Sequence, residues 1–212
     1  MANRRLAIFP LGGAILFPGL HLPLHIFEPR YRSLVGEALV RDRMVGMVQP
    51  RADTAVRAKS LHPPIYDMGC VGRIVEVEAM DDGRYNILLQ GTARFRVVSE
   101  LDVTTPFRQV EADVEDTDMP AGILSSIERA AVERAARSFC DAQGYSVDWA
   151  AITGLDDETF INGIAQVAPF DNASKQALLE ADNLNDRADL AIELMRFFGK
   201  RRPDDDPAVT LQ

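Results

Sequence analysis

The spacing of apolar residues changes once along this chain, and the change restricts what the chain can fold into. Up to about residue 115, apolar and polar residues mostly alternate, which is the period of a half-buried strand. After Met119 and Pro120, the apolar residues recur at the spacing of an amphipathic helix. Strands gathered in one half and helices in the other predict an α+β fold.

The first half carries the pattern of several short strands interrupted by one helix. Strands are expected at residues 5–9, 22–27, 44–48, 71–80, 85–90, 93–97 and 110–114. Asp81-Asp82-Gly83 supplies a hairpin turn, and the helical spacing over residues 28–40 includes Pro29, which suits a first turn. Many short strands with one helix indicate a compact barrel or sandwich rather than a doubly wound sheet.

The second half has the pattern of a series of helices. One ends at Gly144, one covers residues 160–168, one begins after Asp171 and the last ends at Gly199. The predicted apolar stripes are Leu124, Ile127, Ala131, Ala135 and Phe139 on the first helix, and Leu190, Leu194, Phe197 and Phe198 on the last. We expect a β domain in residues 1–117, an α-helical bundle in residues 118–203 and a disordered tail in residues 204–212.

Charge is distributed unevenly between the two halves. Residues 1–110 hold 14 lysines and arginines against 11 aspartates and glutamates, whereas residues 111–212 hold 9 against 21. A strongly acidic surface repels phosphate backbones. Nucleic acid is therefore a disfavoured partner, above all for the second half.

Nothing in the sequence indicates secretion or membrane insertion. Cys70 and Cys140 have no Cys-x-x-Cys pattern, and two buried thiols are a better reading than a disulfide. Prolines and glycines break the apolar run over residues 6–20, and no stretch reaches the roughly 18 uninterrupted apolar residues of a membrane helix. We expect a soluble, cytoplasmic protein without membrane contact, and the oligomeric state stays open.

The compact motifs of common enzymes are absent. The sequence has no Walker A loop, GxGxxG, GxSxG or HExxH motif. It therefore lacks the usual signatures of nucleotide hydrolysis, dinucleotide binding, and serine or zinc hydrolase activity. His21 and His25 have Glu28 nearby, but Pro23 lies between them and a strand would spread them by roughly 13 Å. We expect neither a metal site nor a cofactor.

Arg94 and Arg96 are expected on the polar face of one strand, with Arg73 on a neighbouring strand. In one reading, these arginines form a basic patch for RNA or an acidic peptide. In the other, they belong to the solvated face of a half-buried sheet and pair with Glu76 and Glu78. We favour the second reading because it is the commoner arrangement.

Two stretches of the first half carry a specific combination of short motifs. They are FPLGGAILFPGLHLPLHIFEPRYRSLVGEAL at residues 9–39 and YDMGCVGRIVEVEAMDDGRYNILLQGTARFRVV at residues 66–98. The motifs are Phe9-Pro10-Leu11, Leu16-Phe17-Pro18-Gly19, Leu22-Pro23-Leu24, Phe27-Glu28-Pro29-Arg30-Tyr31, and Gly91 with Arg94-Phe95-Arg96. This combination resembles the N-terminal substrate-binding domain of Lon proteases, and more closely the small standalone bacterial proteins built from that domain alone.

The resemblance implies a PUA-like β pseudo-barrel with an inserted short helix, followed by an α-helical bundle. It also implies a noncatalytic module that recognises unfolded or tagged polypeptides, as an adaptor or holdase in protein quality control with a protease or chaperone as a further partner. In full-length Lon, the ATPase and the Ser-Lys peptidase lie in later domains, and this chain stops before them. We therefore expect no enzyme activity.

An open β-barrel offers strand edges to which an extended peptide can add main-chain hydrogen bonds, with apolar pockets for its side chains. The candidate peptide-binding residues are Phe17, Phe27, Glu28, Arg30, Tyr31, Arg94 and Arg96. The three aromatic residues among them are either pocket walls or, as is commoner, part of the core, and Glu28 and Arg30 are expected to form an ion pair. RNA binding is the alternative function, and an unrecognised hydrolase is a third.

Overall fold

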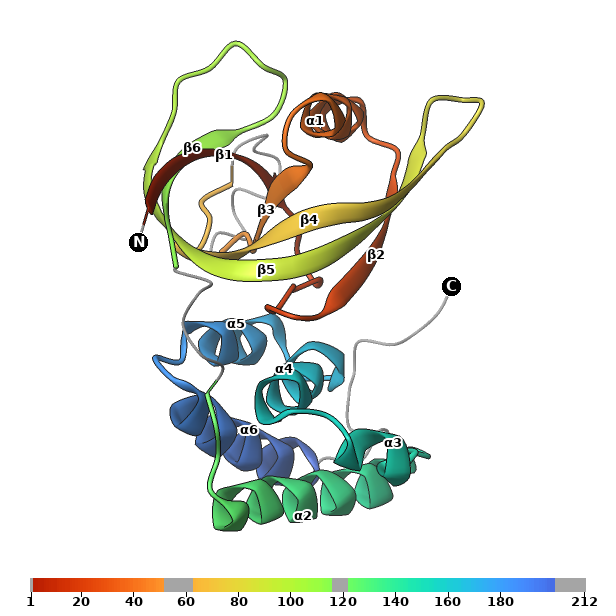
Figure 1. Cartoon of the computed structure of the whole chain (residues 1–212), viewed down its shortest axis with the longest axis vertical. Helices are drawn as coiled ribbons and strands as arrows, with labels where there is room; N and C mark the ends of the chain where they lie inside the picture. The colour runs from red at the N-terminus through yellow and green to blue at the C-terminus, as the bar shows by residue number, and fades with distance from the viewer. Residues whose placement is uncertain (1, 52–62, 116–121, 201–212) are drawn as a thin grey trace. The chain divides into compact units, whose positions relative to one another are not determined.

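The computed structural model describes residues 2–51, 63–115 and 122–200 (Figure 1). By its internal contacts, the chain divides into two compact units, Met1–Pro120 and Ala121–Gln212. Strands and one helix make up the first unit and helices make up the second, so the predicted α+β class is confirmed. The predicted boundary between residues 117 and 118 and the predicted tail at residues 204–212 lie outside the described residues.

The first unit is a mixed sheet that closes on itself (Figure 1). Its strands are β1 (Ala2–Pro10), β2 (His21–Ile26), β3 (Met44–Val48), β4 (Met68–Ala79), β5 (Tyr85–Glu100) and β6 (Gln109–Val114). Their order is β2-β5-β4-β3-β1-β6, with β1 and β3 parallel and the other pairs antiparallel. Because β6 pairs with β5 as well as with β1, five strands close into a barrel and β2 stays at an edge.

β5 makes the closure possible because one of its edges serves two partners. Residues 85–90 pair with β2 and residues 95–100 pair with β6, while β4 lies along the opposite edge. The prediction of two separate strands at 85–90 and 93–97 is therefore wrong, since the chain forms one continuous strand there. The strand has to be long because it spans the barrel and also the open part of the sheet.

A bulge and a glycine occur together in β5. The residues of β4 lie opposite Gly91 and Ala93 but skip Thr92, and such a bulge bends a strand and increases its twist. At Gly91 no side chain fits, because a Cβ there would lie 2.1 Å from the carbonyl oxygen of Phe17. Gly91 thus permits the segment before β2 to approach β5 closely.

One helix, α1 (Pro29–Val40), interrupts the sheet where the sequence predicted it, with Pro29 in its first turn. Its buried face consists of Tyr31, Leu34, Val35 and Ala38, and this face shares a core cluster with Ile26, Ile74, Ile87 and Leu89 of the strands. Burying one large aliphatic side chain stabilises a fold by roughly 1.5–3 kcal/mol. The helix and the sheet therefore hold each other in place.

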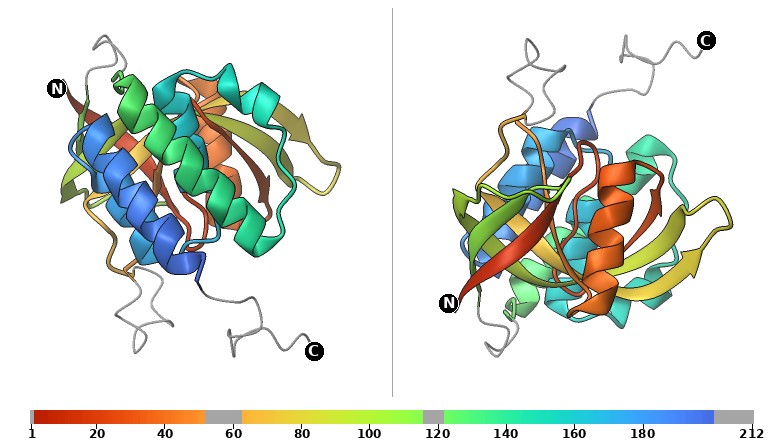
Figure 2. Two further views of the ribbon diagram at one scale, coloured as in Figure 1. Left: turned by 90° about the horizontal axis from the view of Figure 1, so that it is seen from below. Right: turned by 90° about the horizontal axis from the view of Figure 1, so that it is seen from above.

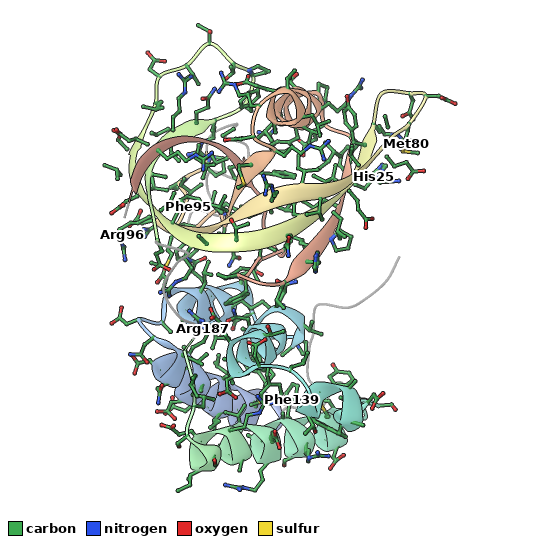
Figure 3. All side chains as sticks on the ribbon, viewed as in Figure 1. His25, Met80, Phe95, Arg96, Phe139 and Arg187 are labelled. Atoms are coloured by element: carbon green, nitrogen blue, oxygen red, sulfur yellow. The ribbon has the colours of Figure 1, made fainter. Side chains whose placement is uncertain are left out.

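A second core fills the barrel around Phe95, whose side chain is fully buried (Figure 3). The other buried members of this cluster are Leu6, Ile8, Val48, Val71, Val110 and Ala112. Phe95 thus faces the interior, as the alternation along β5 predicts.

The second unit contains, in its described part, α2 (Ser126–Gln143), α3 (Trp149–Thr153), α4 (Asp157–Val167), α5 (Asn172–Glu180) and α6 (Leu184–Phe198) (Figure 2). Each helix begins after a residue whose side chain accepts a hydrogen bond from the first turn. These caps are Ser125, Asp148, Asp156, Asp171 and Asn183. A cap of this kind stabilises a helix by about 1 kcal/mol, so the helix starts are set locally by the sequence.

The buried faces of α2 and α6 differ from the predicted stripes. On α2 the buried residues are Val132, Ala136 and Phe139, and Ile127 is 81% exposed. On α6 the buried face includes Ala188, Ala191 and Met195, and Phe197 is 55% exposed. Of the three buried residues of α2, the predicted stripe contained only Phe139.

Arg129 accounts for the rotation of α2. Its guanidinium lies 2.7 Å from the Asp157 carboxylate and 2.9 Å from the Glu133 carboxylate, and it stacks 4.5 Å from the centre of the Phe160 ring. A partly buried cation gains from both an ion pair and an aromatic face. Turning this side of α2 toward α4 leaves Ile127 in solvent.

Arg187 of α6 is buried inside the helical unit, with 4% of its surface exposed (Figure 3). Its Nε donates a hydrogen bond to the Leu178 carbonyl of α5 (2.9 Å), and its Nη1 donates to Oδ1 of Asn162 on α4 (3.0 Å). A buried guanidinium is tolerated only when its donors are satisfied. Arg187 therefore fixes three helices relative to one another.

Replacing Gly91 by alanine should destabilise the protein by about 2–3 kcal/mol, because the new methyl group would overlap the Phe17 carbonyl. Gly36→Ala in α1 is the matched control, since nothing lies within 4 Å of the added Cβ and helix propensity improves. Urea denaturation of both variants measures the difference. Equal free energies of unfolding for the two would contradict the close approach at Gly91.

Replacing Arg187 by methionine should destabilise the protein by about 2–4 kcal/mol, because the Leu178 carbonyl and the Asn162 side chain lose their donor. Arg196→Met, at an exposed position of the same helix, is expected to change stability by less than about 0.5 kcal/mol. Thermal unfolding followed by circular dichroism compares them. Similar melting temperatures would show that Arg187 does not hold the helices together.

Candidate functional site

The helical unit contains an apolar cavity of about 710 Å³. Its aromatic wall residues are Phe139, Tyr145, Trp149 and Phe160, and its larger aliphatic ones are Ile152, Leu155, Ile164, Val167 and Met195. These residues come from α2, α3, α4, α6 and the connecting segments. Mainly apolar cavities of roughly 300–1,000 Å³ are typical binding sites, so this cavity is the leading candidate in the described residues.

The cavity has a buried floor and an exposed rim. Phe139, Phe160 and Met195 are buried, whereas Tyr145 is 49% and Val167 is 80% exposed. Isolated exposed apolar residues are ordinary on a protein surface, but these border the same hollow. An apolar group can therefore contact the rim and continue to the floor.

Local backbone geometry forms one wall of the cavity. Gly144 has a left-handed conformation (φ 72°) that ends α2 and turns the chain, and the Tyr145 ring then lies 6.3 Å from the Phe139 ring. Arg137 lies with its guanidinium 4.3 Å from the centre of the Trp149 ring. This cation–π contact holds the indole in the wall.

Cys140 contributes a thiol to the cavity wall. Burial and the neighbouring Asp141 carboxylate raise the pKa of Cys140, so the thiol form dominates at neutral pH. Cys70 is fully buried in the barrel, and burial raises its pKa as well. Both cysteines are free, as predicted, but Cys140 is only partly buried.

The corner between β2 and α1 holds four of the residues predicted to bind peptide. Glu28 and Arg30 form the expected ion pair, with 2.8 Å between Arg30 Nη2 and Glu28 Oε2. The Arg30 guanidinium lies 4.5 Å from the centre of the Tyr31 ring. Phe27 is 61% exposed and its ring centre lies 6.2 Å from that of His25. Phe27 therefore offers an apolar surface to solvent.

Two of the predicted aromatic residues belong to the core instead. Phe17 is 0% exposed, and Tyr31 is 5% exposed. The Tyr31 hydroxyl donates a hydrogen bond to the Pro10 carbonyl (3.2 Å), and its ring packs 4.0 Å from the Phe9 ring. Neither side chain forms the wall of an open pocket, because both are buried.

Arg94 and Arg96 lie apart from this corner. Arg94 Nε donates to the Glu115 carboxylate (2.8 Å), and Arg96 is exposed on β5, across the barrel from His25 (Figure 3). The suggested pairing with the glutamates of β4 does not occur for Arg94. The seven predicted residues therefore do not form one site.

The edge of β2 offers main-chain groups to a ligand. In the described residues this strand pairs with β5 alone, and the Gly91 N–H donates to the Leu20 carbonyl (2.8 Å) at one end of the pairing. Hydrogen-bonded residues alternate in an antiparallel ladder, so the main-chain groups of His21, Pro23 and His25 point away from β5. Pro23 removes one N–H donor from this edge, which limits nonspecific strand pairing.

The histidines of β2 do not form a metal site. His25 Nδ1 lies 2.7 Å from Asn86 Oδ1, and its Nε2 lies 3.3 Å from Arg84 Nη1. Across residues 2–51, 63–115 and 122–200, no cluster of three potential ligands among His, Cys, Asp and Glu is present. Over the same residues, no helix has the length and apolar character needed to span a membrane.

The prediction from sequence missed the residues that line the cavity, apart from assigning Phe139 and residues 160–168 to helices. A usable signal was the short segment between Gly144 and residue 155, which holds the single tryptophan of the chain together with Tyr145 and other apolar residues. The segment is too short for a helical period to stand out. Which of its side chains enclose a hollow follows only from the packing of α2 and α4.

Comparison with known proteins assigns nearly all of the described chain to one family. The family model for the ATP-dependent protease La (LON) substrate-binding domain matches residues 5–196. Lon protease 2 of Myxococcus xanthus is 31% identical over 90% of this chain, and Lon protease of Flavobacterium johnsoniae is 28% identical over 91%. The chain spans 23% of the length of each of these two relatives.

Solved structures share the fold. A Lon N-terminal domain protein from Xanthomonas campestris superposes with a TM-score of 0.67 at 20% identity, over 90% of this chain and 98% of that one. The N-terminal domain of Lon protease from the Mycobacterium avium complex gives 0.66 at 15% identity, over 91% of this chain and 98% of that one. With the family match over nearly all described residues, the chain belongs to the family of the ATP-dependent protease La (LON) substrate-binding domain.

Proposed function

We propose that this chain is a noncatalytic module that binds polypeptide segments through their apolar side chains. The observation that carries this proposal is the apolar cavity of about 710 Å³ in the helical unit of a substrate-binding domain. Burying one aromatic or large aliphatic side chain contributes roughly 1.5–3 kcal/mol. A cavity of this size supports binding of an apolar group without any chemical step.

The chemistry of the cavity favours segments of non-native proteins as ligands. Its walls are mostly carbon, with the aromatic rings of Phe139, Trp149 and Phe160 as the largest surfaces. Because the walls have few polar groups, they can form few directional hydrogen bonds with a ligand. Such a site favours apolar segments in general rather than one particular sequence. In folded proteins these side chains are buried, and they become available when a protein unfolds.

The barrel supplies a second place for contact with the same class of ligand. The outward main-chain groups of β2 suit an extended segment, and the exposed ring of Phe27 suits one of its apolar side chains. Glu28 and Arg30, also predicted from sequence, are the partly exposed charged residues of this corner. We include this corner as an auxiliary contact.

In the cell, this binding would serve as an adaptor or holdase step in cytoplasmic protein quality control, with a protease or chaperone as partner. RNA is the less favoured ligand, because residues 111–212 hold 9 basic against 21 acidic residues.

Filling the cavity should weaken peptide binding strongly. Gly163 lies in α4 and lines the cavity, with nothing within 4 Å of an added Cβ, so Gly163→Leu places an apolar side chain in the hollow. We expect a loss of about tenfold or more in affinity for a labelled peptide rich in Phe and Leu, measured by fluorescence anisotropy.

Gly163→Ala is the matched control, because its methyl group is small and alanine favours the helix. Phe27→Ala tests the barrel corner separately. Unchanged affinity in Gly163→Leu would refute the role of the cavity, and binding of RNA without binding of peptide would refute the proposed function.

Bound peptide should also protect Cys140 from alkylation. The raised pKa of Cys140 makes the free thiol slower to react than an exposed cysteine, and a ligand in the cavity should slow it further. The protein is treated with iodoacetamide, with and without the Phe- and Leu-rich peptide, and mass spectrometry measures the rate of Cys140 alkylation. Buried Cys70 serves as the internal reference, and an unchanged rate at Cys140 under saturating peptide would contradict binding in the cavity.

A further inference from the structure

A second hollow lies between α2 and α6, which run side by side (Figure 2). The helices point in the same direction, because Asn185 near the start of α6 donates to Glu128 near the start of α2, and Gln143 donates to the Phe198 carbonyl near both ends. The hollow has a volume of about 360 Å³. We call it the α2–α6 groove; its walls include Ala131, Arg134, Ala135, Ser138, Phe139, Ala142, Met195, Arg196, Gly199 and Lys200.

The groove is lined by the basic side chains of residues 122–200 that have no ion pair, hydrogen bond or aromatic contact among the described residues. Residues 121–212 hold 9 lysines and arginines against 16 aspartates and glutamates. Within residues 122–200, four basic side chains have structural contacts: Arg129, Arg137, Lys175 and Arg187. The remaining three, Arg134, Arg196 and Lys200, all line the groove. None of the three is in an ion pair with a carboxylate of the described residues.

Compensation of the helix dipoles accounts for only part of this charge. α2 and α6 both end near the groove, and each helix C-terminus carries roughly half a negative charge. Three full positive charges exceed two half charges of opposite sign. The groove therefore keeps a net positive charge inside a unit that is acidic as a whole.

The groove and the apolar cavity share a wall. Phe139 and Met195 line both hollows, with Ala131, Ala135 and Ala142 of α2 on the groove side and Tyr145, Trp149 and Phe160 on the cavity side. Arg134, Arg196 and Lys200 line the groove on the far side of these two shared residues. The two hollows can thus act as parts of one binding surface.

We propose that the α2–α6 groove binds the carboxylate side chains of a polypeptide segment whose adjacent apolar residues occupy the cavity. This inference rests on the proposed function and specifies its ligand class, namely segments in which Asp or Glu stands beside aromatic or aliphatic residues. The size of the groove suits one or two side chains. A long polyanion such as RNA would meet the acidic remainder of the unit, which repels it.

Two labelled peptides of equal length test the ligand class on the full chain. One contains Phe and Leu beside Asp and Glu, and the other replaces the acids by Asn and Gln. We expect the acidic peptide to bind about tenfold more tightly by fluorescence anisotropy, and added salt to reduce this difference, since the charged groups are exposed.

Substitution of the basic residues tests the groove itself. Arg134→Gln, Arg196→Gln and Lys200→Gln should each lower the affinity for the acidic peptide by about threefold. The affinity for the amide peptide should stay unchanged. Arg73→Gln, which removes an exposed arginine of the barrel, is the matched control and should affect neither peptide. The altered positions are exposed, so the variants are expected to fold.

The outcomes separate the two proposals. The wild-type chain could bind both peptides with equal affinity, and the three substitutions could have no effect. That result would overturn the proposal that the groove binds carboxylates and leave the proposed function intact. Failure of both peptides to bind the wild-type chain would overturn both. A loss of RNA binding in the three variants, with peptide binding unaffected, would assign the groove to a different ligand and overturn the inference.

Discussion

The double pairing of β5 is the interaction on which the barrel depends. One edge of this strand carries β2 over residues 85–90 and β6 over residues 95–100, and without the second pairing the sheet would stay open. The bulge at Thr92 and the absence of a side chain at Gly91 lie where the strand passes from one partner to the other. Closure pairs most strand edges and leaves β2 at an edge, where an extended segment could add main-chain hydrogen bonds.

In the helical unit, the contacts of Arg129 have a comparable role. Its ion pair with Asp157 and its stacking on Phe160 set the rotation of α2 against α4. That rotation turns Phe139 inward and places Cys140 at the edge of the hollow. Phe160, on which Arg129 stacks, also lines the cavity, so this polar contact positions one wall of the hollow.

The two hollows of the helical unit differ in the chemistry of their walls. The cavity is the larger hollow and its walls are mostly carbon, whereas the smaller groove is lined by three basic side chains. Phe139 and Met195 line both hollows and form the wall between them. Such a surface distinguishes ligands by general composition, which suits a domain of the family of the Lon substrate-binding domain.

The sequence by itself determined the features that depend on neighbours along the chain. Alternation, the Asp81-Asp82-Gly83 turn, Pro29 and the capping residue Asp171 act within a few residues, so the strands, α1 and the start of α5 were predictable. Only the tertiary structure decided that residues 85–100 form one strand, that Phe17 is core, and which faces of α2 and α6 are buried. Each of these depends on a partner distant in sequence. The Phe17 carbonyl lies against Gly91, β6 pairs with β5, and Asp157 forms an ion pair with Arg129. The cavity and the groove belong to this second class, because a hollow exists only once the helices around it are packed.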